Sequence, residues 1–466
     1  MHRLRGADAG FLYAENPTMP VDATILVEFA APDPGAGPLT VEGLRRHLAG
    51  RLDEIPSYRW RLRRVPLGLH HAMVVDDPDF DLDYHLRSAT VEAPGDAAAV
   101  DRLIGVLAPR RFDRRHPLWM ATLIDGLQGG RQGLLLQFQH VFFDGTAIGT
   151  ILSRLLGDAP GDPRADAAPY RPEWPSALRL ILGALQDLGP TFRRIPALFS
   201  ASRRGQQAAK AQAGQETLPA PKVQDVPRTI LNDAFSLDRV FTRVTVSMED
   251  VGLVRRAASA TVNQVVLASV AGALRAYLES RSALPDRSLI ADVPISTRPE
   301  ELPPSVGGNW VSHFKTTLAT DQEDPWKRLQ IICTGSREAR ERIVLEGAGL
   351  PAEWLDLGLP FIAEPVMRIW SRRRRKHRDT VEFNALISNV RAPAAPLGIG
   401  PSRVDAIAMS GPPLDGAGLN ITVATFGDDL CFAIQANPTA VDDAIELAGG
   451  IRDALAELVA LAADHH

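Results

Sequence analysis

A histidine at the end of an apolar run, His140, has the sequence surroundings of a residue that acts on a substrate. The run begins at Leu134, and Asp144 and Gly145 come shortly after the histidine. Because the side chains of a strand alternate between its two faces, the pattern predicts that one face carries Leu134, Leu136, Phe138 and His140. The imidazole would then stand at the end of a buried row, where it can face a cavity.

The chemistry that this arrangement predicts is general-base catalysis. A neutral imidazole has a reference pKa of about 6.5, so at neutral pH it can accept the proton of a hydroxyl group. The hydroxyl oxygen can then attack a thioester carbonyl without a protein nucleophile, and base assistance is worth about 10² to 10⁴ in rate. Asp144 can accept backbone amides or pair with a cation, and Gly145 permits a sharp turn. The alternative for His140 is a hydrogen-bonded core histidine.

Three further residues are candidates for supporting roles. Asn263 can donate its amide to the developing thioester oxyanion, or it can cap a helix predicted over 264–279, and the sequence leaves both open. We expect Arg298, which follows a predicted strand, to pair with Asp144 and so hold the turn that carries His140; the alternative is a solvated surface arginine. Trp119 is expected to pack beside the His140 strand rather than to touch substrate.

The elements around these residues indicate an α/β protein in three parts. Residues 1–158 alternate predicted strands, such as 23–29 and 134–138, with helices at 41–52, 97–107 and 146–156. Residues 159–235 are rich in Pro, Ala and Gln and predict a crossover with a short helix capped by Ser176. Residues 236–466 alternate again, with predicted strands at 241–246, 289–293, 313–318, 419–425 and 430–436, and helices at 263–279 and 444–461.

Composition narrows the class of function. The chain has 466 residues and a formal net charge of −5, which argues against nucleic acid as a main partner. Its two cysteines, Cys333 and Cys431, have no CxxC spacing, so neither a metal site nor a disulfide framework is expected. No signal-peptide pattern and no stretch of about 18 uncharged apolar residues is seen, so we expect a cytoplasmic protein.

A basic run beside an apolar, aromatic-bearing segment predicts contact with a lipid surface. Trp370 precedes Arg372, Arg373, Arg374 and Arg375. Such a segment is typical of a peripheral anchor to anionic lipid, at the inner face of the membrane or on lipid droplets. The same positive field would attract the phosphates of coenzyme A. The alternative is a solvated charged face of a helix.

Several motifs in order resemble the wax ester synthase/diacylglycerol acyltransferase family, which belongs to the acyltransferases that share an HHxxxDG motif. The chain has Asp8-Ala-Gly-Phe11-Leu12-Tyr13-Ala-Glu15, the acidic segment 75–86 and Pro117-Leu118-Trp119. The segments 261–268, 293–298, 308–309, 388–390 and 418–422 follow in family order. The resemblance covers nearly the whole chain. It implies two chloramphenicol-acetyltransferase-like halves with a substrate tunnel between them, which acyl-CoA and acceptor enter from opposite sides.

The resemblance also implies an activity, and two positions depart from it. The second histidine of the family motif is the catalytic base, and His140 stands at that position. The first histidine is replaced by Gln139, and Gln264 replaces the aspartate that usually follows Asn263. We expect Gln139 to point away from His140 and to hydrogen-bond as the histidine would. The expected reaction moves a long-chain acyl group from acyl-CoA, the co-substrate, to diacylglycerol or a long-chain alcohol, without a metal or redox cofactor. The alternatives are an inactive lipid-binding paralogue and a transferase that esterifies polyketide diols.

Overall fold

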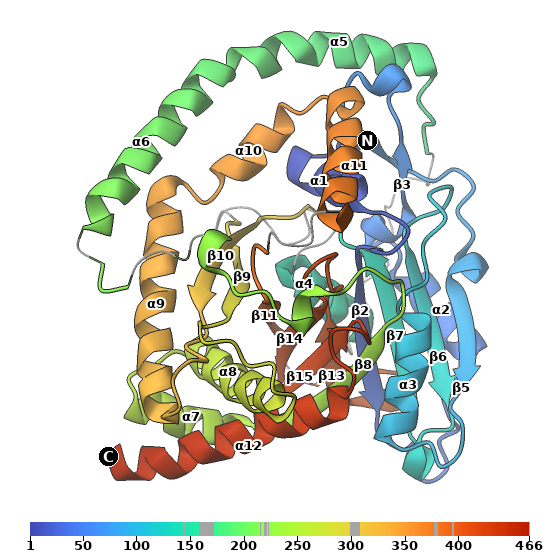
Figure 1. Ribbon diagram of the computed structural model, residues 1–466. Helices are drawn as coiled ribbons and strands as arrows, with labels where there is room; N and C mark the ends of the chain where they lie inside the picture. The colour runs from blue at the N-terminus through green and yellow to red at the C-terminus, as the bar shows by residue number, and fades with distance from the viewer. Residues whose placement is uncertain are drawn as a thin grey trace.

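Two six-stranded sheets form the body of the protein (Figure 1). The structure is a computed structural model, and it describes residues 1–142, 145–157, 172–214, 216–218, 221, 223–298, 308–376, 381–393 and 396–465. Each sheet carries helices, so the predicted mixed α/β class with two halves is confirmed.

The first sheet carries the predicted site. Its strands lie in the order β12-β13-β2-β7-β6-β5. In chain order they are β2 (Asp22–Phe29), β5 (Leu86–Thr90), β6 (Trp119–Asp125), β7 (Gln132–Gln139), β12 (Gly398–Ile399) and β13 (Ser402–Ser410). The helices of this half are α2 (Val41–Arg51), α3 (Ala97–Leu107) and α4 (Gly145–Leu156). The predicted alternation in β7 is correct, because Leu134, Leu136 and Phe138 belong to one buried cluster and Leu135 to another.

The second sheet is built from the C-terminal part of the chain. Its order is β10-β9-β11-β14-β15-β8. The strands are β8 (Val240–Ser247), β9 (Ile290–Ser296), β10 (Val311–Thr317), β11 (Ala385–Arg391), β14 (Leu419–Phe426) and β15 (Asp429–Ala436). The helices of this half are α7 (Met248–Ala257), α8 (Val262–Ser280), α9 (Pro325–Glu346) and α12 (Ala444–Ala462). Both α8 and α12 supply buried side chains to the large core cluster of this half.

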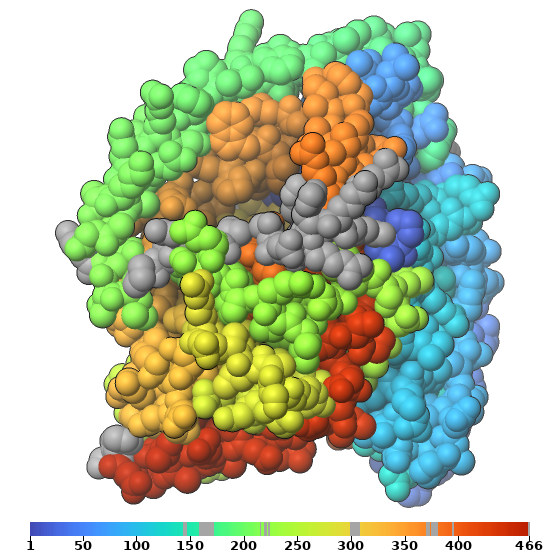
Figure 2. Space-filling model, viewed as in Figure 1, coloured from blue at the N-terminus to red at the C-terminus, as the bar shows by residue number. Residues whose placement is uncertain are grey.

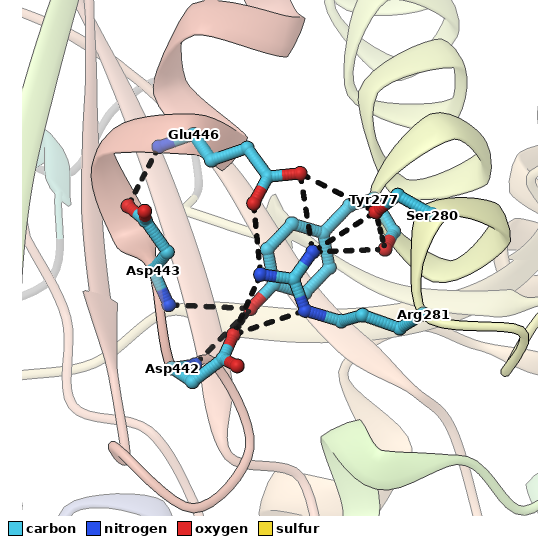
Figure 3. Close-up of polar contacts among 6 residues, drawn as sticks. All are labelled: Tyr277, Ser280, Arg281, Asp442, Asp443 and Glu446. Carbon is cyan, nitrogen blue, oxygen red and sulfur yellow. Dashed lines mark hydrogen bonds and ion pairs between the residues drawn. The ribbon is translucent and has the colours of Figure 1, made fainter.

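A polar network joins the C-terminal end of α8 to the N-terminal start of α12 (Figure 3). Arg281 pairs with Asp442 at 2.8 Å and with Glu446 at 2.8 Å, and it lies over the ring of Tyr277. The Tyr277 hydroxyl donates to Asp442 at 2.5 Å. These contacts hold the end of α8 against the start of α12 over the core of this half.

The two halves share strands as well as surfaces. The strands β12 and β13 come from residues 398–410, yet β13 pairs with β2 in the first sheet. The division into 1–158 and 236–466 places these residues in the C-terminal part of the chain, whereas their hydrogen bonds complete the N-terminal sheet. A buried cluster also spans the halves, with Ile104 and Leu135 from one and Phe241 and Ala433 from the other.

The crossover forms a long helical arch. The helix predicted after Ser176 begins there, because the Ser176 side chain accepts from the amide of Arg179 at 3.2 Å. It is α5 (Ala177–Arg193), and α6 (Ile195–Ala213) continues it, so the segment is more helical than the sequence predicts. In Figure 1 the two helices curve over the body, and in Figure 2 they form a continuous ridge along its upper and left edges.

Three helices lie beneath this arch. They are α1 (Gly6–Ala14), α10 (Leu350–Asp356) and α11 (Pro360–Lys376), and α1 packs against the other two. The close approach of α1 to α10 needs a glycine at position 6, because a Cβ there would lie 2.0 Å from the backbone of Leu355. A small sheet, β1 (His2–Arg3), β4 (Met73–Asp76) and β3 (Trp60–Arg63), flanks them.

Within the described residues no single helix is long and apolar enough to cross a bilayer, and α7 with α8 meets the test only as a pair bent by 101°.

Candidate functional site

His140 lies directly after β7 and is half-buried. Its backbone amide donates to the carbonyl of Val21 at 3.0 Å, which extends the pairing of β7 with β2 by one residue. The strand therefore fixes the backbone of His140, while the side chain is not sealed inside the core. The position at the end of β7 agrees with the sequence pattern, and the facing of the imidazole into a cavity stays a prediction.

A group of hydrogen bonds centred on Asn309, in the C-terminal half of the chain, also holds His140. The side-chain amide of Asn309 donates to the backbone carbonyl of His140 in a short hydrogen bond. Asp8 in α1 accepts from the backbone amide of Asn309 at 2.5 Å and from its side chain at 3.1 Å. Arg5 donates to the Asn309 carbonyl at 3.2 Å and lies over the ring of Trp310. Residues 5–8 and 309–310 thus fix the position of His140 through its backbone.

The carboxyl group of Asp8 is electrostatically unusual. Its side chain is 2% exposed, and burial raises its pKa to about 6, although the hydrogen bonds from Asn309 oppose this shift. A buried carboxylate is tolerated because both donors of Asn309 point to it. Asp8 therefore changes charge in the pH range in which an imidazole does.

An aromatic ring from α1 covers the imidazole. The ring of Phe11 stacks on that of His140 with centroids 5.4 Å apart and an interplanar angle of 17°. Offset stacking of this kind restricts ring rotation and removes one face of the imidazole from water. A substrate can therefore reach the imidazole only from a side that Phe11 does not cover.

Gln139 points to a buried carboxylate, as expected for a residue on the face opposite His140. Its side-chain amide donates to Glu15 at 3.0 Å, and Glu15 also pairs with Arg111 at 3.4 Å and with Arg114 at 2.5 Å. Asp22 is the cross-strand neighbour of Gln139, and burial together with the charge of Glu15 raises its pKa well above the usual range. Gln139 thus replaces a histidine in a polar cluster that includes α1.

The predicted partner of Arg298 lies outside the described residues, since these omit 143 and 144, including Asp144. Gly145 begins α4. Arg298 itself donates to the carbonyl of Gly308 at 3.1 Å, and the amide of Gly308 donates to the carbonyl of Phe142 at 2.9 Å. Arg298 therefore reaches the His140–Phe142 segment through Gly308, and its pairing with Asp144 stays a prediction.

The start of α8 corrects one expectation about Asn263. The helix begins at Val262, and Thr261 is its N-cap, so Asn263 does not cap it. Gln264 closes the capping box by accepting from the amide of Thr261 at 2.8 Å, and its amide donates to the Cys333 carbonyl in α9 at 3.0 Å. Gln264 thus serves the helix end and the contact between α8 and α9. Asn263 lies half-buried in the first turn, and its role at the oxyanion stays a prediction.

Trp119 is a packing residue, as predicted. It is 2% exposed, donates its indole N–H to the Tyr58 carbonyl at 2.8 Å, and stacks between Tyr58 and His85. In the register of β6 and β7 it pairs with Phe138, two residues before His140.

Sequence reasoning missed the residues that position His140. Phe11 and Asn309 contact His140, Glu15 accepts from Gln139, and Asp8 holds Asn309 in place. One signal was available: Asp8 and Glu15 are separated by two helical turns, so they share a face, and Phe11 lies between them on that face.

Comparison with known proteins identifies the chain. The wax ester synthase/diacylglycerol acyltransferase catalytic domain matches residues 4–266, and the C-terminal domain of the same family matches residues 307–459. The chain belongs to the wax ester synthase/diacylglycerol acyltransferase family. The predicted resemblance is confirmed, and the chain is an O-acyltransferase.

Relatives of this family cover the full length. A Mycobacterium tuberculosis protein provisionally named a diacylglycerol O-acyltransferase is 30% identical over 476 residues, covering 99% of this chain and 98% of the relative. The wax ester synthase/diacylglycerol acyltransferase from Marinobacter aquaeolei VT8 is 22% identical, with a TM-score of 0.65, covering 99% of this chain and 100% of that one. The first condensation domain of the CDA synthetase, 18% identical, has a TM-score of 0.59 and covers 99% and 96%. These two structures support the shared fold.

Proposed function

We propose that the protein transfers a long-chain acyl group from acyl-CoA to diacylglycerol or a long-chain alcohol, with His140 as the general base. The observation that carries this proposal is a half-buried imidazole held by both halves of the molecule. The hydroxyl proton of the acceptor moves to His140 as its oxygen bonds to the thioester carbonyl carbon. The carbon–sulfur bond then breaks, and the proton passes to the coenzyme A thiolate. This transfer is redox-neutral and uses no metal or redox cofactor.

The fixed backbone of His140 supports the base role. Effective proton transfer needs the base within hydrogen-bond reach of the hydroxyl, and positional error of about 1 Å costs about 10² in rate. The Val21 carbonyl, Asn309 and the Phe11 ring restrain the residue from three directions. Because Nδ1 of His140 is buried, we assign Nε2 as the nitrogen that meets the acceptor.

The test is an assay of free thiol released from palmitoyl-CoA, with and without diacylglycerol or hexadecanol. We expect acceptor-dependent release by the wild type and a loss of about 10² to 10⁴ in H140A. H116A is the matched control, since the His116 ring stacks on Tyr84, and it should keep wild-type activity. Full activity in H140A would remove His140 from the mechanism.

The same assay separates the alternatives. Thiol release that needs a long-chain diol, and not diacylglycerol or hexadecanol, would favour a transferase acting on polyketide diols. No acceptor-dependent release by the wild type would favour a lipid-binding paralogue without activity.

We also propose that the protein contacts a lipid surface through α5 and α11. Leu178, Leu182 and Leu185 share one face of α5 and are 65%, 51% and 51% exposed. In α11, Ile362, Val366 and Ile369 share a face and are 53%, 55% and 51% exposed. Both helices contact the turn Pro66–Gly68, where Leu67 is 80% exposed. An apolar surface of this kind on a protein whose acceptors are lipids favours peripheral attachment.

The basic run that the sequence predicts as the anchor ends α11. Arg373 is exposed, and the side chains of Trp370, Arg372, Arg374 and Arg375 lie outside the described residues. Replacing Leu178, Leu182 and Leu185 together by Ser should reduce sedimentation with vesicles of anionic phospholipid, while thermal unfolding stays unchanged. Unchanged sedimentation would contradict contact through α5.

A further inference from the structure

A cavity of about 640 Å³ lies beside α1. It is bounded by Leu12 and Tyr13 of α1, by residues 61–68, by Trp174 before α5, and by the first turns of α11. Its volume is in the range of small-molecule binding sites.

The charge of this cavity is strongly positive. Among its lining residues, one is acidic, Glu364, and five are arginines: Arg61, Arg63, Arg64, Arg114 and Arg368. His70 also lines the cavity, and burial lowers its pKa to about 4, so it is neutral at pH 7 and adds no charge.

Within the described residues, the carboxylates near the cavity do not neutralise the positive charge of its five arginines. Arg61 pairs with the buried Asp77 at 3.1 Å, and Arg114 pairs with Glu15. Arg64 and Arg368 share Glu364, at 3.9 and 3.4 Å. Both of these side chains are 68% exposed, so the shared carboxylate holds them weakly.

Among the cavity arginines, Arg63 differs because no carboxylate of the described residues neutralises its charge. Its Nε is buried and has no hydrogen-bond partner, and within the described part of the chain no carboxylate pairs with it. Its guanidinium instead lies 5.0 Å from the ring centroid of Trp174, which Arg61 also faces at 4.6 Å. A buried guanidinium nitrogen without an acceptor is costly, so an acceptor supplied by a ligand would stabilise the site.

We propose that this cavity binds the phosphate group of a ligand, with Arg63 as its central contact. Guanidinium groups match phosphate geometry in a bidentate manner, and a planar arginine held over an aromatic ring is already oriented. The phosphate ester can be carried by the nucleotide part of acyl-CoA or by a phospholipid headgroup. The first source rests on the function proposed above, and the second fits the neighbouring apolar faces of α5 and α11.

The helix α1 connects this cavity to the His140 site. Tyr13 lines the cavity, whereas Phe11 of the same helix stacks on His140. Arg114 lines the cavity and pairs with Glu15, which accepts from Gln139. The cavity and the proposed catalytic base therefore both contact residues of α1.

The test measures binding of the full-length protein to two probes. Equilibrium dialysis compares coenzyme A with 3′-dephospho-coenzyme A, and co-sedimentation uses vesicles of phosphatidic acid in phosphatidylcholine. The variants are R63Q and R368Q, and the matched control is R102Q, at an exposed arginine of α3. We expect R63Q to weaken binding of one probe about tenfold or more, R368Q to weaken it less, and R102Q to leave it unchanged. Thermal unfolding of each variant checks the fold.

The two probes distinguish the possible sources of the phosphate. Weaker coenzyme A binding with unchanged vesicle binding assigns the phosphate to the nucleotide, and the reverse assigns it to the phospholipid headgroup. Wild-type affinity of both R63Q and R368Q for both probes overturns the proposal, as does wild-type protein that binds neither. Binding does not require turnover, so a wild type without acceptor-dependent thiol release would contradict the proposed function and leave the cavity assignment standing.

Discussion

Contacts to the backbone of His140, more than contacts to its ring, define the site at the scale of single residues. Asn309 and Val21 bind the two backbone polar groups of His140, and Asp8 orients Asn309. These contacts come from α1, the residue before β2 and the segment before β10, so one residue of the first half depends on the second.

The Asp8 carboxyl gives this arrangement a pH dependence. Its pKa is raised from 3.8 to about 6 in the folded state, so between these values the folded protein binds more protons than the unfolded one. The contribution of Asp8 to the free energy of unfolding should therefore fall as pH rises from about 4 to 6, by about 3 kcal/mol, and stay level above that. D8N should lack this contribution, so its stability should fall less than that of the wild type over this range, since Asn keeps an acceptor for Asn309 and does not ionise. Urea unfolding of both proteins at pH 4, 5, 6 and 7 checks it; parallel curves would contradict the prediction.

The replacement of histidine by Gln139 should not abolish activity. The side chain points to Glu15, on the face opposite His140, and a histidine at this position can donate to the same carboxylate. Q139H should keep the rate of acyl transfer within about tenfold of the wild type, which corresponds to 1.36 kcal/mol or less in the barrier. Thiol release from palmitoyl-CoA measures it, with Q139L as the variant that removes the donor. A gain far above tenfold in Q139H would indicate that the glutamine disables this chain.

At the scale of elements, the residues at helix ends and the contacts between helices determine which helix bounds the sequence predicts correctly. The helix that the sequence predicts over 97–107 is found with these bounds as α3, where Asp96 is the N-cap. The sequence does not predict α1, whose buried Asp8 breaks the apolar pattern and accepts hydrogen bonds from Asn309, 301 residues away. Nor does the sequence predict where α8 begins. The choice between Thr261 and Asn263 as its N-cap depends on which side chain accepts from the backbone amides of the first helical turn.

Gln264 offers a test of the capping box. Q264A should lower the free energy of unfolding by about 1 to 2 kcal/mol, because the amide of Thr261 and the carbonyl of Cys333 each lose a partner. Q264E is the matched variant: its carboxylate still accepts from Thr261 but cannot donate to Cys333, so its loss should be smaller. Denaturant unfolding measures both, and equal stability of Q264A and the wild type would contradict this role.

A buried ion cluster joins the two sheets at the scale of the whole molecule. Arg243 of β8 pairs with Glu28 of β2 in a short contact and with Asp101 of α3 at 3.6 Å. All three side chains are 13% exposed or less. Removing the shared cation leaves two buried carboxylates, one of them with a pKa already raised to about 6.

R243M should therefore destabilise the protein by about 3 to 5 kcal/mol at pH 7. The loss should shrink near pH 5, because the Asp101 pKa rises further without Arg243 and protonation then removes the unpaired charge. R131M is the control, since Arg131 contacts Glu28 from a position that is 36% exposed. Thermal unfolding at the two pH values measures the difference; a loss independent of pH would contradict the electrostatic account.

The long-range pairing of β13 is also beyond local sequence patterns. The two sheets follow from alternation and turn residues, but the pairing of Ile407 with Val27 joins residues far apart in the chain. Only complementary buried faces and free strand edges select such a partner, and neither is visible in a window of neighbouring residues.

The strand β13 limits how proteins of this architecture can recombine. An exchange between two relatives at the crossover would pair the β2 edge of one parent with the β13 edge of the other. The irregular register between Val404 and Ala406 would then have to match a foreign partner strand. Hybrids that carry β2 and β13 from the same parent should fold more often than simple exchanges at the crossover, so gene fusion and duplication in such a lineage must conserve this pair as a unit.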